Sequence, residues 1–143
     1  MSEAIKHECG IALIRLRKPL DYYIKKYGSP MYPINKLYVL MEKQSNRGQD
    51  GAGVANVKIN VPAGHRYISR YRSIANRPIV DLFAKINEKY SAVLKSQPEK
   101  MKDADWLQEN LAFSGEVWLG HLRYGTHGKN EIESCHPMLR QSN

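Results

Sequence analysis

Three short segments of the chain carry residue types that could perform chemistry. They are His7-Glu8-Cys9-Gly10, residues 46–53 and residues 120–128. A cysteine thiolate attacks an amide carbonyl when a base stands beside it. An arginine such as Arg123 can hold both oxygens of a carboxylate through its planar guanidinium. Cys9 is therefore the candidate nucleophile, and Arg123 is the candidate ligand of a substrate carboxylate.

Each segment also has a purely structural explanation when it is taken alone. A cysteine before a strand is most often a small buried hydrophobe. Residues 46–53 could be the exit of a helix followed by a closely packed strand. Residues 120–128 could be a strand that runs into a glycine turn, with Arg123 in a salt bridge. The occurrence of all three segments in this order favours the chemical interpretation.

The elements that must position these segments follow from the spacing of apolar residues. Continuous or alternating apolar residues predict strands over 10–16, 55–61, 65–73 and 117–124, the second and third joined by a turn at Pro62-Ala63-Gly64. Apolar residues at helical spacing predict helices from Ile34 to about Ser45, from Pro78 through Val93, and from about Asp103 to Phe113. Residues 18–33 form a polar connector in this interpretation. Strands neighbouring in sequence and segregated helices indicate an α+β fold and not a Rossmann pattern.

Length and composition limit the classes of protein. The 143 residues, 42% of them hydrophobic, suit one domain. No apolar run approaches the roughly 20 residues of a membrane helix, and the start MSEAIKHE lacks the apolar region of a secretory signal. We therefore expect a cytoplasmic protein without a membrane partner. The two cysteines, Cys9 and Cys135, have no CxxC spacing, so neither a disulfide framework nor a metal site is expected.

The formal charge of +8 raises the possibility of a nucleic-acid partner. Cations and aromatic residues interleave over residues 65–72, which could follow a phosphate backbone. The same alternation fits a strand with one solvated face, and we favour that interpretation. Nucleic acid is therefore not the expected partner, although a non-catalytic basic binding domain remains the alternative.

Taken together, the three segments resemble the class II glutamine amidotransferases, which use an N-terminal cysteine nucleophile. In that family Cys-Gly-Ile opens the mature chain, an RG-x-[DE]-x-AG segment follows the first helix, and an H-x-R-[YW]-x-T motif closes a later strand. Residues 49–53 and Tyr124 look most like the glutamine phosphoribosylpyrophosphate amidotransferases of purine synthesis. Residues 126–128 lean towards glucosamine-6-phosphate synthase, which remains an alternative branch.

The resemblance implies a role for the free amine of an N-terminal cysteine. An α-amine titrates at about 7.7–8.0 and a thiol at about 8.5, so the amine can accept the thiol proton near neutral pH. Glutamine then gives a cysteine thioester and ammonia, and water releases glutamate. Here residues 1–8 precede Cys9, and they are interpreted as a leader or propeptide.

The resemblance also assigns roles to other residues of the three segments. It implies that Arg47 acts near Cys9 as part of the catalytic machinery, with Gly10 and Gly48 in support. Substrate binding falls to Arg123, Thr126 and His127, and Tyr124 supports the site where two active sites communicate. The substrate would be glutamine, and no cofactor is expected within this chain.

The family architecture implied is an αββα sandwich of two antiparallel sheets between helix layers. Residues 9–143 would be a partial glutaminase domain, incomplete at its C-terminal end, with a helical insertion at about 76–113. That insertion is either a decoration packed on the outside or a dock for another domain or subunit. The Asn-Gly pair of the family's oxyanion hole is not in the sequence, so the isolated chain is expected to be inactive. A C-terminal phosphoribosyltransferase domain that uses Mg²⁺, and a homo-oligomer, are the expected partners.

Overall fold

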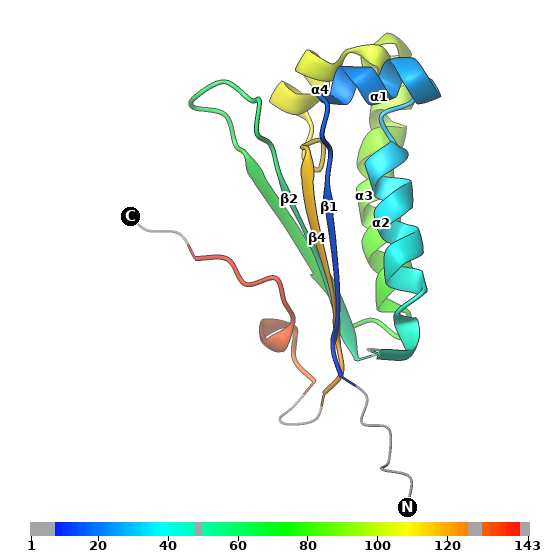
Figure 1. Cartoon of the computed structure of the whole chain (residues 1–143), viewed down its shortest axis with the longest axis vertical. Coiled ribbons are helices and arrows are strands. Elements are labelled where there is room, and N and C mark those ends of the chain that lie inside the picture. The colour runs from blue at the N-terminus through cyan, green and yellow to red at the C-terminus, as the bar shows by residue number, and fades with distance from the viewer. Residues whose placement is uncertain (1–7, 48–49, 126–129, 141–143) are drawn as a thin grey trace, which may run out of the picture.

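One antiparallel sheet with helices on one of its faces forms the body of the chain (Figure 1). The computed structural model describes residues 8–47, 50–125 and 130–140. Within these residues the sheet has four strands in the order β1-β4-β2-β3. Their bounds are Gly10–Arg15 (β1), Gly51–Val57 (β2), Ile68–Ser73 (β3) and Val117–Arg123 (β4). The α+β class predicted from the sequence is therefore confirmed.

Strand β4 lies inside the sheet although it is the last strand in the described chain. It pairs antiparallel with β1, where Gly10 lies opposite Leu122, and with β2, where Gly53 lies opposite His121. Strand β3 returns along β2 as the predicted hairpin. Gly64 in the connecting turn has a φ of 88°, a conformation that favours glycine. The end of β4 consequently lies beside the start of β1.

Strand β2 begins earlier than predicted and buries a polar side chain. The strand starts at Gly51, earlier than the predicted 55–61, because Gly51 and Gly53 belong to the strand and do not break it. Asn56 is buried on the helix-covered face, where its Nδ2 donates to the Val117 carbonyl at 3.0 Å and its Oδ1 accepts from the Gly115 amide at 2.7 Å. A fully bonded amide side chain is thus tolerated in the buried interior.

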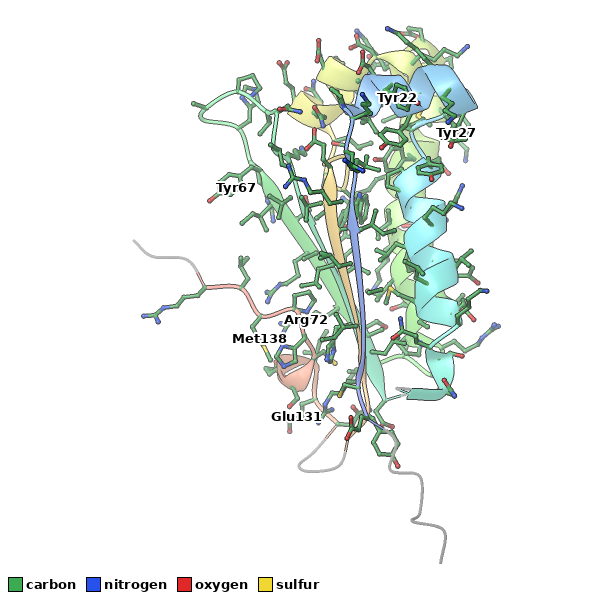
Figure 2. The ribbon with its side chains drawn as sticks, viewed as in Figure 1. Tyr22, Tyr27, Tyr67, Arg72, Glu131 and Met138 are labelled. Atoms are coloured by element: carbon green, nitrogen blue, oxygen red, sulfur yellow. The ribbon has the colours of Figure 1, made fainter. Side chains whose placement is uncertain are left out.

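The helices are α1 (Leu20–Tyr27), α2 (Tyr32–Glu42), α3 (Pro78–Ser96) and α4 (Ala104–Asn110). Helix α1 falls in the segment predicted to be a connector, so that prediction was wrong. Only Leu20 and Ile24, one turn apart, are buried, and Gly28 ends the helix in the left-handed conformation. Tyr22 and Tyr27 point outward (Figure 2). Leu20, Tyr23, Ile24 and Tyr27 do recur at helical spacing, but the helix has only eight residues and stands between Pro19 and Pro30, so the segment was interpreted as a connector.

Helix α3 is part of the core and not an external decoration. Its residues Leu82, Phe83, Ile86 and Tyr90 are at most 3% exposed and pack into the main hydrophobic cluster with α2 and the sheet. Pro78 occupies the first turn, where its missing N–H costs no hydrogen bond. The predicted helix from Pro78 is confirmed, and the α2–α3 pair is the layer that covers the sheet (Figure 1). No helix in the described ranges is long and apolar enough to cross a membrane.

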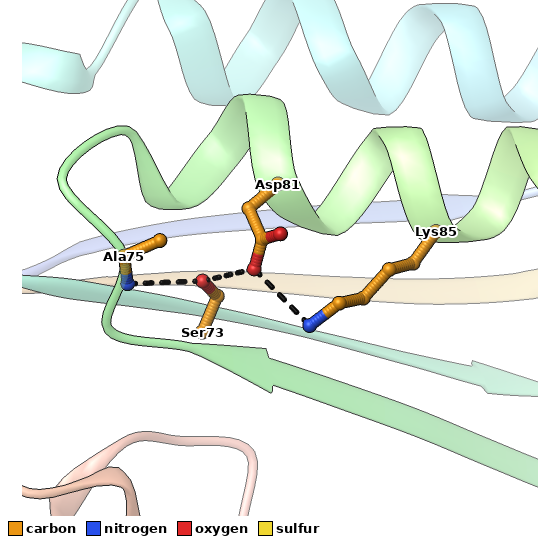
Figure 3. Close-up of polar contacts among 4 residues, drawn as sticks. All are labelled: Ser73, Ala75, Asp81 and Lys85. Carbon is orange, nitrogen blue, oxygen red and sulfur yellow. Dashed lines mark hydrogen bonds and ion pairs between the residues drawn. The ribbon is translucent and has the colours of Figure 1, made fainter.

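A polar contact fixes the start of α3 to the end of β3 (Figure 3). The buried Ser73 hydroxyl donates to Asp81 Oδ2 at 2.6 Å and accepts from the Ala75 amide at 3.2 Å. Lys85 Nζ lies 3.1 Å from the same carboxylate oxygen. The Ser73 hydrogen bond, followed by Lys85, lowers the pKa of Asp81. The charge of Asp81 is therefore held towards the sheet.

Helix α4 is joined to the sheet by a buried polar group just before β4. Asp103 caps the helix by accepting from the Trp106 amide at 3.0 Å, as expected for an N-cap. Glu116 is 2% exposed; its carboxylate accepts from the side chain of Gln108 on α4 and from the Ile59 amide at 2.6 Å. Both helices of segment 76–113 are thus hydrogen-bonded to residues at the ends of strands, α3 through Asp81 and α4 through Gln108.

The other face of the sheet is partly covered by residues 130–140 (Figures 1 and 2). Arg70 donates to the carbonyl of Pro137 at 3.2 Å, and Arg72 donates to that of Cys135 at 3.3 Å. These two cations of the basic stretch therefore bind the backbone of residues 135–137, which lies beside them in space. Farther along the same face, Ile11 and Leu13 on β1 are 65% and 64% exposed. We call this side, lined by the outward residues of β1 and β4, the outer face.

Candidate active site

Cys9 lies at the start of β1, beside the end of β4. Its Sγ accepts a hydrogen bond from the backbone amide of Tyr124 at 3.4 Å and lies 3.9 Å from the Tyr124 carbonyl oxygen. The side chain of Cys9 is exposed, so an external molecule can reach the sulfur. The antiparallel pairing of β1 with β4 explains how residues 115 positions apart in sequence come together. The first and third predicted segments therefore meet at one end of the sheet.

Asp50 brings the second predicted segment to the same place. Its amide donates to the Arg123 carbonyl at 3.2 Å, and its Oδ2 accepts from the Gly125 amide at 2.7 Å. The carboxylate thus holds the chain immediately after Tyr124, whose amide faces the sulfur. Sequence reasoning placed Asp50 in a motif but gave it no role. Its position before β2, where a side chain can bond the end of β4, becomes visible only with the strand order.

Gln44 is a second residue that the sequence did not single out. Its Nε2 donates to the Ile11 carbonyl at 3.2 Å. A Cβ at Gly10 would lie 2.9 Å from Gln44 Oε1, so a larger residue at Gly10 would displace this contact. Gly10 therefore leaves room for the side chain of Gln44 next to Cys9. Polar exposed glutamines are frequent, and nothing in the sequence pattern distinguishes this one.

The structure places the remaining predicted residues unevenly. Arg47 ends a short 3-10 helix, Ser45–Arg47, which lies against β4, but its side chain is outside the described part. Gly48, Thr126 and His127 also lie outside the described residues. Their predicted roles stay predictions.

Arg123 points to the outer face and is 7% exposed. Its Nη1 donates to Asn130 Oδ1 at 2.8 Å, and no sequence pattern predicted this contact. A guanidinium holds a carboxylate through two N–H groups. One such group of Arg123 already donates to the amide oxygen of Asn130. Alternation from the paired Gly10 and Leu122 puts Cys9 on the same outer face. The candidate nucleophile and the candidate carboxylate ligand therefore share one side of the sheet.

The segment after Asn130 packs on two glycines of β2. A Cβ at Gly51 would overlap Cys135 Sγ, and one at Gly53 would overlap the His136 carbonyl oxygen. These glycines therefore begin the closely packed strand that was one explanation of residues 46–53. Burial raises the pKa of the Cys135 thiol, an effect that the nearby charge of Arg123 opposes. Cys135 is 0% exposed and so differs from Cys9 in both access and surroundings.

His121 and His136 form a pair on the outer face, with ring centroids 4.8 Å apart. Burial, and then the neighbouring His136, lower the pKa of His121. The folded-state pKa of His121 lies below that of the unfolded chain, which is about 6.5. As the pH falls through this range, the unfolded chain therefore binds more protons than the folded chain does. We expect the free energy of unfolding to decrease as the pH is lowered from 7.5 to 5.5.

The check is the urea midpoint at both pH values for the wild type and for His121→Gln. Glutamine keeps polarity but cannot take up the proton, so the variant should lose part of this pH dependence. His65, which is exposed and whose Nδ1 lies 3.3 Å from the nearby Pro62 carbonyl oxygen, offers a matched control as His65→Gln. An equal pH dependence in the wild type and His121→Gln would contradict the assignment.

Comparison with protein-family models, curated proteins and solved structures found no match to this chain. Function is therefore inferred from the described geometry and the sequence. Within residues 8–47, 50–125 and 130–140, no group of three or more histidine, cysteine or acidic side chains is placed to hold a metal ion. The chemistry available at this end of the sheet is that of an exposed thiol beside the backbone amide of Tyr124, with a buried guanidinium on the same face.

Proposed function

We propose that this chain supplies the nucleophile and part of the substrate site of a glutamine amidotransferase of the N-terminal nucleophile type. The observation that carries the proposal is the contact between Cys9 Sγ and the Tyr124 amide at 3.4 Å. Asp50 ties the second motif to the same point through Gly125. Three segments distant in sequence, each matching a motif of that family, thus converge at one end of the sheet.

In the proposed reaction Cys9 Sγ attacks the side-chain carbonyl carbon of glutamine. The α-amine of an N-terminal Cys9 takes the thiol proton and delivers it to the departing nitrogen, which leaves as ammonia. Water then attacks the thioester, the carbon–sulfur bond breaks, and glutamate leaves with the thiol restored. The amide of Tyr124 fixes the position of the sulfur before attack. Residues 1–8 act as a leader in this proposal, because a peptide nitrogen has no available lone pair to serve as the base.

Arg123 is the proposed ligand of the glutamine α-carboxylate. Its buried guanidinium sits on the same face as Cys9, and a partly desolvated arginine binds a carboxylate more strongly than an exposed one does. Asn130 Oδ1 would have to give up its 2.8 Å bond for a bidentate contact to form. Arg47, Thr126 and His127 complete the site in this proposal, with Gly48 in support.

The outer face supports the finer αββα architecture as a proposal. Ile11 and Leu13 expose 65% and 64% of their surface beside the partly buried Leu119. An antiparallel sheet can bury apolar residues of one face against a second sheet about 10 Å away. We propose that a second sheet of the glutaminase domain covers these residues.

The acceptor of the ammonia follows from the resemblance alone. We place the chain in an amidophosphoribosyltransferase of purine synthesis, with glucosamine-6-phosphate synthase as the second candidate. The phosphoribosyl-transfer domain, and the Mg²⁺ it would use, belong to that proposal. A basic binding domain is less well supported, since Arg70 and Arg72 of the basic stretch bond to carbonyls of residues 135 and 137.

A chloroketone analogue of glutamine tests the proposed nucleophile. We expect intact mass to show one adduct, mapped to Cys9, in the chain that begins at Cys9, and none in the same time when residues 1–8 are retained. Cys135 is an internal control, because it is 0% exposed and its thiol pKa is raised by burial. Iodoacetamide, which needs no recognition, should label Cys9 in both forms because that side chain is exposed. Equal reaction of the analogue with both forms, or an adduct on Cys135, would refute the proposal.

A further inference from the structure

Two consecutive peptide groups at the end of β4 connect Asp50 with Cys9. The first joins Arg123 to Tyr124. Its carbonyl accepts from the Asp50 amide at 3.2 Å, and its N–H donates to Cys9 Sγ at 3.4 Å. The second joins Tyr124 to Gly125. Its N–H donates to Asp50 Oδ2 at 2.7 Å, and its carbonyl oxygen lies 3.9 Å from Cys9 Sγ. Each peptide group therefore contacts Asp50 with one polar atom and Cys9 with the other.

The strand order brings these atoms together. Cys9 immediately precedes β1 and Asp50 immediately precedes β2, and β4 lies between the two strands. The C=O and N–H of a trans peptide point in opposite directions, and in an antiparallel sheet they point towards the two neighbouring strands. Tyr124, the first residue after β4, therefore presents backbone atoms to Cys9 on one side and to Asp50 on the other.

The two sides hold these peptide groups with unequal strength. On the Asp50 side both contacts have the length of an ordinary N–H···O hydrogen bond. The one to the carboxylate is charge-assisted, and such bonds are about twice as strong as neutral ones. On the Cys9 side the acceptor is sulfur, which is a weak one. The position of the Tyr124 amide is therefore set mainly from the Asp50 side.

An anchor at this point has a physical reason. Cys9, Tyr124 and Gly125 are all exposed, and the pairing of β4 with β2 ends at Arg123. Backbone that is exposed beyond the end of a ladder has few contacts to keep it in one position. Asp50 is half-buried at the start of β2 and extends the ordered backbone of β4 to the residues beside the sulfur.

We propose that Asp50 is a positioning residue for the Cys9 sulfur and acts through the two peptide groups of Tyr124. The thiolate is the reactive form of a cysteine, and a hydrogen-bond donor held at the sulfur stabilises that form. Asp50 keeps the Tyr124 N–H in this place. The inference rests on the proposed function only where it treats Cys9 as the attacking group.

The acceptor oxygen of Asp50, and not its charge, carries this role. The bond to the Gly125 amide needs an oxygen that accepts, which an uncharged side chain can also supply. A negative charge near the sulfur would oppose the thiolate by repulsion. The amide of asparagine should therefore replace the carboxylate.

The rate at which iodoacetamide alkylates Cys9 tests this role. The whole chain is used, and the adduct is mapped by mass spectrometry. We expect Asp50→Ala to be alkylated about fivefold more slowly than the wild type, which is the effect of losing about one net hydrogen bond. Asp50→Asn keeps an oxygen that can accept from Gly125, so its rate should not fall below about half that of the wild type.

Asp81→Ala is the matched control for the loss of a carboxylate. Asp81 also accepts a short hydrogen bond, 2.6 Å from the Ser73 hydroxyl, and also joins two elements. It does so at β3, which β2 separates from β4. Its replacement should lower the urea midpoint and leave the alkylation rate of Cys9 within about twofold of the wild type. Urea unfolding is measured for every variant, so that a general loosening of the sheet is recognised.

Three results would overturn the inference. Asp50→Ala could be alkylated at the wild-type rate, Asp50→Asn could be as slow as Asp50→Ala, or Asp81→Ala could slow the alkylation of Cys9 equally. The chloroketone analogue of glutamine separates these failures from a failure of the proposed function. If the analogue labels Cys9 while the Asp50 variants are alkylated like the wild type, only the positioning role is wrong. If the analogue does not label Cys9 while Asp50→Ala is slow and Asp50→Asn is not, the proposed function is wrong and the positioning role stands.

Discussion

If the proposed function is right, retaining residues 1–8 should slow glutamine hydrolysis about 10²–10⁴-fold in the complete enzyme. The comparison is with the same polypeptide beginning at Cys9. The expected loss is that of a general base, because the leader converts the α-amine of Cys9 into a peptide nitrogen that cannot accept the thiol proton. Glutamate release, measured at saturating glutamine, reports this loss in kcat.

A polypeptide that begins at Glu8 is the matched control for this prediction. It removes nearly all of the leader, yet the nitrogen of Cys9 remains in a peptide bond. We expect it to be as slow as the unprocessed form. If it were as fast as the form beginning at Cys9, the leader would act by obstructing glutamine and not by masking the amine. Cys9→Ala in the processed form should remove the remaining activity, which identifies the sulfur as the reacting atom.

The sequence predicted those elements whose apolar residues repeat over several turns or along a whole strand. The period in α3, from Ile79 to Val93, gave both its start and its buried face. Strand β2 was placed too late because Gly51 and Gly53 were interpreted as a break, although glycine there admits residues 135 and 136. The position of β4 between β1 and β2 is a long-range pairing, and local periodicity contains no information about such a pairing.

The candidate site was predictable to the extent that its residues belong to compact motifs. Cys9 and Tyr124 were both singled out, but their contact depends on the strand order that places β4 beside β1. Asp50 was seen in its motif, yet its bond to the Gly125 amide requires the same strand order. Asn130 could not be found from the sequence, because an exposed asparagine in a polar segment resembles any other surface residue.

Replacing Trp118 by alanine should lower the free energy of unfolding by about 3–5 kcal/mol, the usual cost of removing a large buried aromatic side chain. Trp118 is 0% exposed and lies on the helix-covered side of β4, with its ring centroid 6.0 Å from that of Phe113. Its Nε1 also donates to the Gly115 carbonyl at 3.1 Å. Since small domains are stable by only about 5–15 kcal/mol, this single change should remove a large part of the total.

Trp106 on α4 provides the matched control, since it is only partly buried. Its ring centroid lies 5.6 Å from Lys100 Nζ. Trp106→Ala should cost clearly less, about 1–2 kcal/mol, when urea unfolding is followed by circular dichroism. Because β4 ends beside Cys9, loosening its packing should also let the Tyr124 amide move away from the sulfur. Labelling of Cys9 by the glutamine analogue should therefore slow in Trp118→Ala and not in Trp106→Ala. Equal unfolding free energies for the two variants would mean that β4 is not packed against the helix layer through Trp118.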